Sequence, residues 1–100
     1  MANSEETIKS DIKAHMQKGG GAYAAWYVGI SKTPRDRLFN GHRVHEKDDW
    51  WIYRQAETAA AAQSVESYFV NTPGTDGGTG GGDKESDYVY AYKKNAHTDP

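Results

Sequence analysis

At 100 residues, the chain is long enough for one domain with a single modest core, and its formal net charge of −2 provides no global attraction for phosphate. It contains no cysteine, which excludes disulfides, thiolate nucleophiles and cysteine-based zinc sites. Its acidic N-terminus lacks the apolar stretch of a signal peptide, and no segment approaches the ~20 apolar residues of a membrane span, so we expect a cytoplasmic protein.

The first third of the chain predicts a helix followed by a strand. The helix begins after Ser4, a good N-cap, carries Ile8 and Ile12 on its apolar face and ends at the glycines of 19–21. Residues 22–31, AYAAWYVGIS, are almost all apolar and rich in aromatic and β-branched side chains. This composition predicts a central strand that is covered on both faces.

A second, short helix is predicted directly after this strand. Thr33 is a suitable cap and Pro34 fits a first helical turn, so the helix begins here and carries Arg37. It ends near Gly41, and the polar residues 42–49 predict a loop.

The second half of the chain repeats the strand-and-helix pattern once and ends on a strand. Residues 50–54 predict a strand, and residues 57–71, with four consecutive alanines, predict the clearest helix. Residues 74–83 form a glycine-dense segment without the Gly-Lys-Ser/Thr ending of a phosphate-binding loop. We interpret this segment as a flexible connection that borders any substrate groove. Tyrosines alternate with Val and Ala in residues 87–94, which predicts a last strand.

The elements together predict an α+β fold in the order α-β-α-β-α-β. A small three-stranded sheet is flanked by helices in a single domain over residues 1–94. Residues 95–100, NAHTDP, predict a disordered tail.

One stretch combines residue types that suit chemistry on a phosphate. Residues 26–42 read WYVGISKTPRDRLFNGH and place Tyr27, Arg37 and His42 across a strand-to-helix junction, while Glu66 lies on the later helix. On these residues the chain resembles the GIY-YIG nuclease family. In that family a strand with a Tyr-Ile-Gly motif leads into a helix with an essential arginine, and a later helix carries a metal-binding glutamate. The resemblance covers roughly residues 23–71.

The resemblance implies a metal-dependent endonuclease that hydrolyses DNA. Arg37 would bind the phosphate, Glu66 would hold Mg²⁺, and Tyr27, or a tyrosine of the last predicted strand, would assist the attacking water. His42 would act as the base because the pKa of histidine lies near neutrality. Asn71 takes the place of a late asparagine of the family.

The chain departs from the family in its first half-motif. Gly-Ile-Tyr normally stands on its own strand, but here Tyr23 lies only four positions before Tyr27, and no hairpin fits between them. We therefore expect the last strand, residues 87–93, to pair beside residues 24–30 in a permuted version of the fold. The missing tyrosine would then come from this strand, as Tyr88, Tyr90 or Tyr92.

Several alternatives remain open from the sequence. Basic residues near the predicted strand ends and on the second helix would form a DNA-binding patch with neighbouring aromatic side chains, or a scattered surface; they are Lys32, Arg35, Arg43 and Arg54. His45 competes with His42 for the role of base. The alternative function is a non-catalytic module of the same fold that binds nucleic acid or protein, and a third reading is a chance match in a small structural or regulatory domain.

Overall fold

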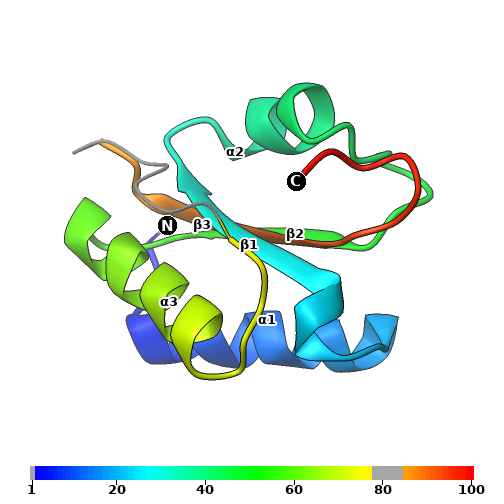
Figure 1. Ribbon diagram of the computed structural model, residues 1–100. Coiled ribbons are helices and arrows are strands. Elements are labelled where there is room, and N and C mark those ends of the chain that lie inside the picture. The colour runs from blue at the N-terminus through cyan, green and yellow to red at the C-terminus, as the bar shows by residue number, and fades with distance from the viewer. Residues whose placement is uncertain (1, 78–84) are drawn as a thin grey trace.

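A three-stranded antiparallel sheet separates two covering layers in the computed structural model, which describes residues 2–77 and 85–100 (Figure 1). The fold is α+β, as predicted. In chain order its elements are α1 (Glu5–Gly19), the 3-10 turn η1 (Tyr23–Ala25), β1 (Trp26–Ser31), α2 (Pro34–Asp36), the π turn η2 (Arg37–Gly41), β2 (Trp51–Gln55), α3 (Ala59–Asn71) and β3 (Tyr88–Lys93). None of the helices in the described ranges has the length and apolar character needed to cross a membrane.

The last strand occupies the centre of the sheet, and β1, the predicted central strand, lies at one edge although it is buried. The strand order is β1-β3-β2, and both neighbours run antiparallel to β3. Tyr90 lies opposite Gly29 of β1, and Tyr92 lies opposite Tyr27. The predicted pairing of the C-terminal strand with the strand that carries Tyr27 is therefore confirmed.

Helices α1 and α3 cover one face of the sheet and form the larger core (Figure 1). Helix α1 begins at its Ser4 cap, whose hydroxyl accepts a hydrogen bond from the Thr7 N–H at 3.2 Å. The buried side chains of the two helices follow helical spacing, which brings each apolar stripe onto the sheet; they are Ile8, Ile12, Met16, Ala62, Val65 and Phe69.

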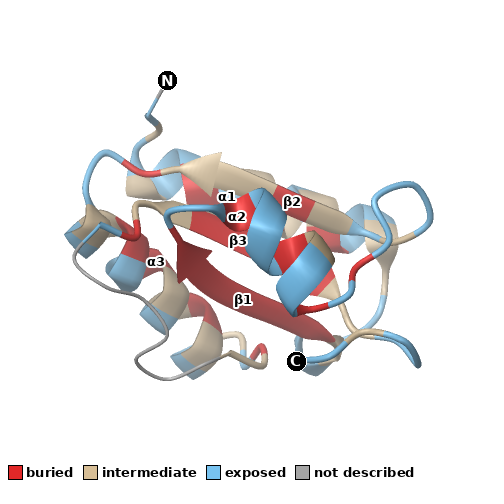
Figure 2. Cartoon of the chain, turned by 90° about the horizontal axis from the view of Figure 1, so that it is seen from above, coloured by how far each residue is buried: buried red, intermediate tan, exposed pale blue. Residues whose placement is uncertain are grey.

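The opposite face of the sheet carries a row of tyrosines. Tyr27, Tyr90 and Tyr92 pack there against Leu38 and Val44. Helix α2, turn η2 and the C-terminal residues lie over this face (Figure 1). Figure 2 shows the result: β1 is buried along its whole length, whereas much of β2 is only partly covered.

The segment after α3 closes the outer edge of β1. The Asp76 N–H donates to the Trp26 carbonyl at 2.8 Å, and the Val28 N–H donates to the Asp76 carbonyl at 2.9 Å. These bonds pair an edge that would otherwise expose its backbone groups. The glycine-dense segment predicted as a flexible connection is described only as far as Gly77, and residues 78–84 lie outside the described residues.

Two predicted elements differ from the structure, one in where it begins and one in how it is capped. Residues 22–25 do not belong to the strand, because the chain leaves Gly20 and Gly21 at positive φ and makes a 3-10 turn before Trp26. Thr33 occupies the predicted N-cap position of α2, but its side chain makes no capping bond. Its N–H donates to the Ser31 hydroxyl at 2.9 Å.

The C-terminal residues also differ from the predicted disordered tail. They fold back over the tyrosine face, where the Asp99 N–H donates to the His42 carbonyl at 2.7 Å. Asn95 donates from its side-chain amide to the Asp49 carboxylate at 2.8 Å. Polar partners far away in the sequence therefore hold a segment whose own composition favours disorder.

Close packing between Gly29 and Tyr90 gives a stability test. A Cβ at position 29 would lie 2.5 Å from the Tyr90 hydroxyl oxygen and 2.6 Å from its ring carbon Cζ. Gly29→Ala should lower the free energy of unfolding by about 1–3 kcal/mol, because a buried ring has no room to move. Urea denaturation measures this change.

Gly41→Ala is the matched control. The nearest atom to a Cβ at that position is the Arg37 Cδ at 3.9 Å, so the substitution should change the free energy of unfolding by less than about 1 kcal/mol. Equal losses in both variants would contradict the packing argument.

Candidate functional site

A π turn brings Arg37 and His42 to the same side of the chain. The His42 N–H donates to the Arg37 carbonyl at 2.8 Å, five residues back, and this bond defines η2. An ordinary α-helix would carry two residues with this spacing onto diverging faces. Single π turns are rare and are frequent at functional sites.

Two buried hydrogen bonds fix the tautomer of His42, which is only 6% exposed. Its Nδ1 lies 2.8 Å from the Asp99 carbonyl oxygen, and its Nε2 lies 2.7 Å from the Tyr90 hydroxyl. Because a carbonyl only accepts, Nδ1 carries the proton. Nε2 therefore accepts the hydrogen bond that the Tyr90 hydroxyl donates.

Burial keeps His42 in its neutral form near pH 7. Burial lowers the pKa of His42 below its ordinary value, the Asp99 carbonyl opposes this shift, and the positive charge of Arg37 lowers the pKa further. A neutral imidazole whose Nε2 accepts a hydrogen bond is the form that takes up a proton.

The tyrosine row surrounds this histidine. The ring centre of Tyr27 lies 4.6 Å from that of His42. The Tyr27 ring also stacks on the ring of Tyr92, with 5.3 Å between the two ring centres. Tyr92 places its hydroxyl 3.2 Å from Nδ1 of His42. Burial is the main cause that raises the pKa of Tyr92 above its ordinary value. Tyr92 therefore helps to orient the imidazole and keeps its own proton.

Arg37 and Glu66 have opposite effects on the pKa of the Tyr90 hydroxyl. The pKa of Tyr90 is raised to about 12, mainly by burial. Tyr27 also raises this pKa, Arg37 lowers it through its charge and a hydrogen bond, and Glu66 has the smallest effect and raises it.

Glu66 is held at an energetic cost. It is half-buried on α3, and no hydrogen bond or ion pair connects it to another of the described residues. Burial raises the pKa of Glu66 from 4.5 to about 7. A single carboxylate with no cation beside it in the described part of the chain suits a hard ion such as Mg²⁺, which keeps several waters and needs only one or two carboxylates.

Three of the four basic residues predicted to bind nucleic acid are engaged in ion pairs. Lys32 pairs with Glu85 at 3.2 Å, Arg35 with Glu46 at 3.0 Å, and Arg54 with Asp11 at 3.0 Å. Arg54 extends from the sheet face that α1 covers, opposite to the tyrosine row, so the structure does not gather it with the others.

Arg43 is exposed and has positive φ directly after His42, and no ion pair involves it within the described ranges. Lys32, Arg35 and Arg43 thus remain on the side of the molecule that carries α2 and η2.

Two hollows lie beside the tyrosine row. One, of about 290 Å³, is lined by Arg37, His42 and Asp99, together with Gly41 and Pro100. The other, of about 370 Å³, has Lys32, Arg35 and Tyr88 in its wall. Tyr88 makes an edge contact with Tyr53 there, so the structure separates it from His42 and leaves Tyr90 as the tyrosine at the site.

The structure thus gathers Tyr27, His42 and Tyr90, with Arg37 beside His42 in the wall of one hollow. Glu66 lies on α3, which covers the opposite face of the sheet. Sequence reasoning missed the Asp99 carbonyl that fixes the tautomer, since a backbone acceptor in a polar tail carries no sequence signal. Searches against protein-family models, curated proteins and solved structures find no significant match for this chain.

The raised pKa of Glu66 predicts a pH-dependent stability. The folded-state pKa lies above the ordinary value, so the folded protein binds this proton more tightly than the unfolded chain. Stability is therefore lost as pH rises from about 4.5 through about 7. Glu66→Gln should exceed the wild type by on the order of 1–3 kcal/mol at pH 8 and match it at pH 4.5.

Urea unfolding at both pH values measures the difference, and the exposed Glu57→Gln serves as the control with no such change expected. A Glu66→Gln effect of the same size at both pH values would show that ionisation of Glu66 does not oppose folding.

Proposed function

We propose that this chain is a metal-dependent phosphodiesterase that acts on DNA, with a site similar to that of GIY-YIG nucleases. The observation that carries the proposal is the hydrogen bond from the Tyr90 hydroxyl to Nε2 of His42, with Arg37 and Glu66 acting on the same hydroxyl. A proton acceptor, a cation and a carboxylate then all influence one phenol, and phosphoryl transfer uses these three kinds of group.

Each side chain has a role in this reaction. Arg37 binds the phosphate through its guanidinium, which matches phosphate geometry. Tyr90 passes its proton to Nε2 of His42 as it takes one from the attacking water, and the Asp99 carbonyl that accepts from Nδ1–H sets the tautomer of His42 before substrate binds. Glu66 would hold Mg²⁺, and a divalent ion supplies positive charge against the developing charge of the phosphate.

The sheet topology supports a permuted arrangement of the motif. Tyr23, the tyrosine nearest to the family's first half-motif in sequence, is 38% exposed in the turn η1 and stands outside the tyrosine row. Tyr90 enters the row from β3 and lies across Gly29, the glycine of the Tyr-Val-Gly motif. We assign the missing tyrosine to Tyr90 on this basis.

Two observations favour the alternative, a non-catalytic module that binds nucleic acid or protein. Asp99 covers His42, and the Tyr90 hydroxyl is buried, so a substrate reaches them only after the C-terminal residues move. The paired states of Lys32 and Arg35 also lower the positive charge available for DNA. In this function Arg37 and Arg43 bind a ligand without hydrolysis.

A cleavage assay tests the proposal. The wild-type chain should nick a labelled DNA duplex in Mg²⁺ and lose activity in EDTA. Arg37→Ala and Glu66→Gln should each reduce the rate by about 100-fold or more, since each removes an interaction with the reacting phosphate or its ion. Arg54→Ala, which removes the same charge from the opposite face, should retain the rate.

The outcomes separate the candidate functions. Equal rates in wild type and Arg37→Ala would contradict hydrolysis at this site and indicate a contaminating nuclease. DNA binding that survives Glu66→Gln, falls in Arg37→Ala and weakens steeply with salt, without any cleavage, would establish the binding module instead.

A further inference from the structure

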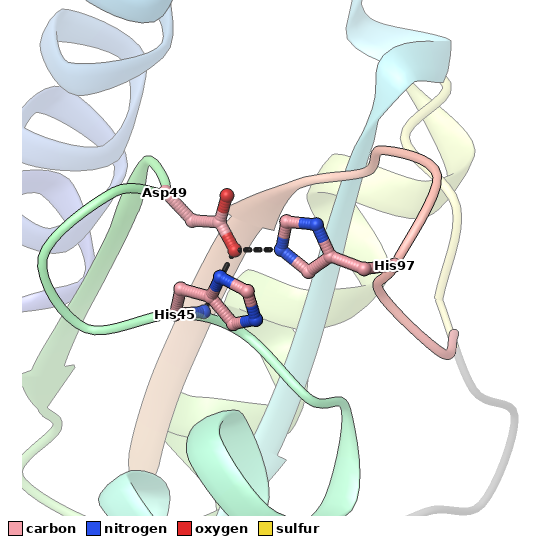
Figure 3. Close-up of side chains that lie close together, drawn as sticks. All are labelled: His45, Asp49 and His97. Atoms are coloured by element: carbon pink, nitrogen blue, oxygen red, sulfur yellow. Dashed lines mark hydrogen bonds and ion pairs between the residues drawn. The ribbon is translucent and has the colours of Figure 1, made fainter.

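Two histidines and an aspartate from distant parts of the chain meet beside the tyrosine face. His45 and Asp49 belong to the turn before β2, and His97 belongs to the segment after β3. Figure 3 shows their side chains pointing toward one another. One ligand atom from each lies within 4.8 Å of the others. Among the described residues, this is the group of three metal-ligating side chains that lie so close together.

The aspartate is held in place before any ion binds. Its side chain is only 5% exposed, and one carboxylate oxygen, Oδ2, accepts the His45 N–H at 2.7 Å. The other oxygen accepts the Asn95 amide at 2.8 Å. The Asp49 N–H in turn donates to the His45 carbonyl at 3.0 Å, which closes the turn. A carboxylate fixed in this way loses little conformational freedom when it binds an ion.

The two imidazoles lie against each other next to this carboxylate. Their ring centres are 3.8 Å apart with an angle of 14° between the planes, and Nε2–H of His97 donates a hydrogen bond to Oδ2 of Asp49. His97 keeps 40% of its side chain exposed, so an ion has access from solvent. An ion would take the place of the proton in this bond.

We propose that His45, Asp49 and His97 bind a divalent transition-metal ion, with Zn²⁺ as the best fit and water at the remaining position. Imidazole nitrogen with carboxylate oxygen suits Zn²⁺ and its neighbours, whereas Mg²⁺ prefers oxygen ligands alone. Zinc bonds of about 2.0–2.1 Å place tetrahedral ligand atoms about 3.4 Å apart, so rotation of the exposed rings suffices to close the site.

The ion would also fasten the C-terminal segment over the tyrosine face. His97 stands two residues before Asp99, whose carbonyl fixes His42. A metal shared between His97 and the turn at 45–49 makes this covering segment part of a closed loop. The site shares no ligand with the proposed hydrolytic site, because neither Glu66 nor Arg37 contributes to it.

Isothermal titration of the untagged full chain with ZnCl₂ tests the site. We expect one ion per chain with a micromolar Kd, and at least a tenfold weaker Kd in His97→Ala and in His45→Ala. His15→Gln, which changes a histidine on α1, and Glu66→Gln should both bind Zn²⁺ as the wild type does. MgCl₂ should produce no heat that competes with Zn²⁺.

A Co²⁺ titration provides a second readout, since visible absorption of bound Co²⁺ reports its ligands directly. Absorption that appears in the wild type and vanishes in His97→Ala, a change at an exposed side chain, supports the proposal. Failure of the wild type to bind Zn²⁺ below 1 mM, or binding that is unchanged in both His45→Ala and His97→Ala, overturns it. Loss of DNA cleavage in Glu66→Gln with Zn²⁺ binding intact separates the two metal proposals.

Discussion

The buried hydroxyl of Tyr90 determines much of this structure. Its oxygen lies on the central strand, away from solvent, and a buried hydroxyl without a partner costs about 1–3 kcal/mol. His42 supplies the partner, and the Asp99 carbonyl in turn satisfies the other ring nitrogen. The ring reaches this position only because residue 29 is a glycine. Strand, π turn and C-terminal segment are therefore coupled through one phenol.

The ionised carboxylate of Glu66 reduces the stability of the fold. Glu66 sits half-buried, and no cation among the described residues contacts it, while Arg37 faces solvent beside a neutral imidazole. Selection for stability alone would favour an apolar residue at position 66, next to Val65 and Phe69. Groups with displaced pKa values that converge in this way are typical of sites that bind or transform a ligand.

Local patterns predicted the elements well. Ile8, Ile12 and Met16 follow the helical period, and the alternation of tyrosine with small apolar residues in β3 gave both the strand and its buried face. The pairing of β3 beside β1 followed from a count of strands and a vacant place in the motif. These features depend on residues that are close in sequence, or on the few ways of assembling three strands.

The remaining features depend on contacts that no local pattern contains. The π turn brings His42 round to Arg37 where helical spacing alone would carry the two apart. Residues 95–99 look disordered until the turn at 45–49 and the backbone of His42 provide their partners. The predicted basic patch is weakened by contacts of the same kind. Lys32 and Arg35 form ion pairs with Glu85 and Glu46, which are distant from them in sequence and approach them only in the folded chain.

The central position of β3 has a consequence for how the chain acquires its structure. Strands β1 and β2 pair with β3 and not with each other, so neither has a sheet partner until residues 88–93 have been synthesised. The nascent chain has α1 and α3 available early but must wait for its final strand. Folding should accordingly be a late, cooperative event that is slow for a protein of this size, because distant segments have to find one another before any hydrogen-bonded ladder forms.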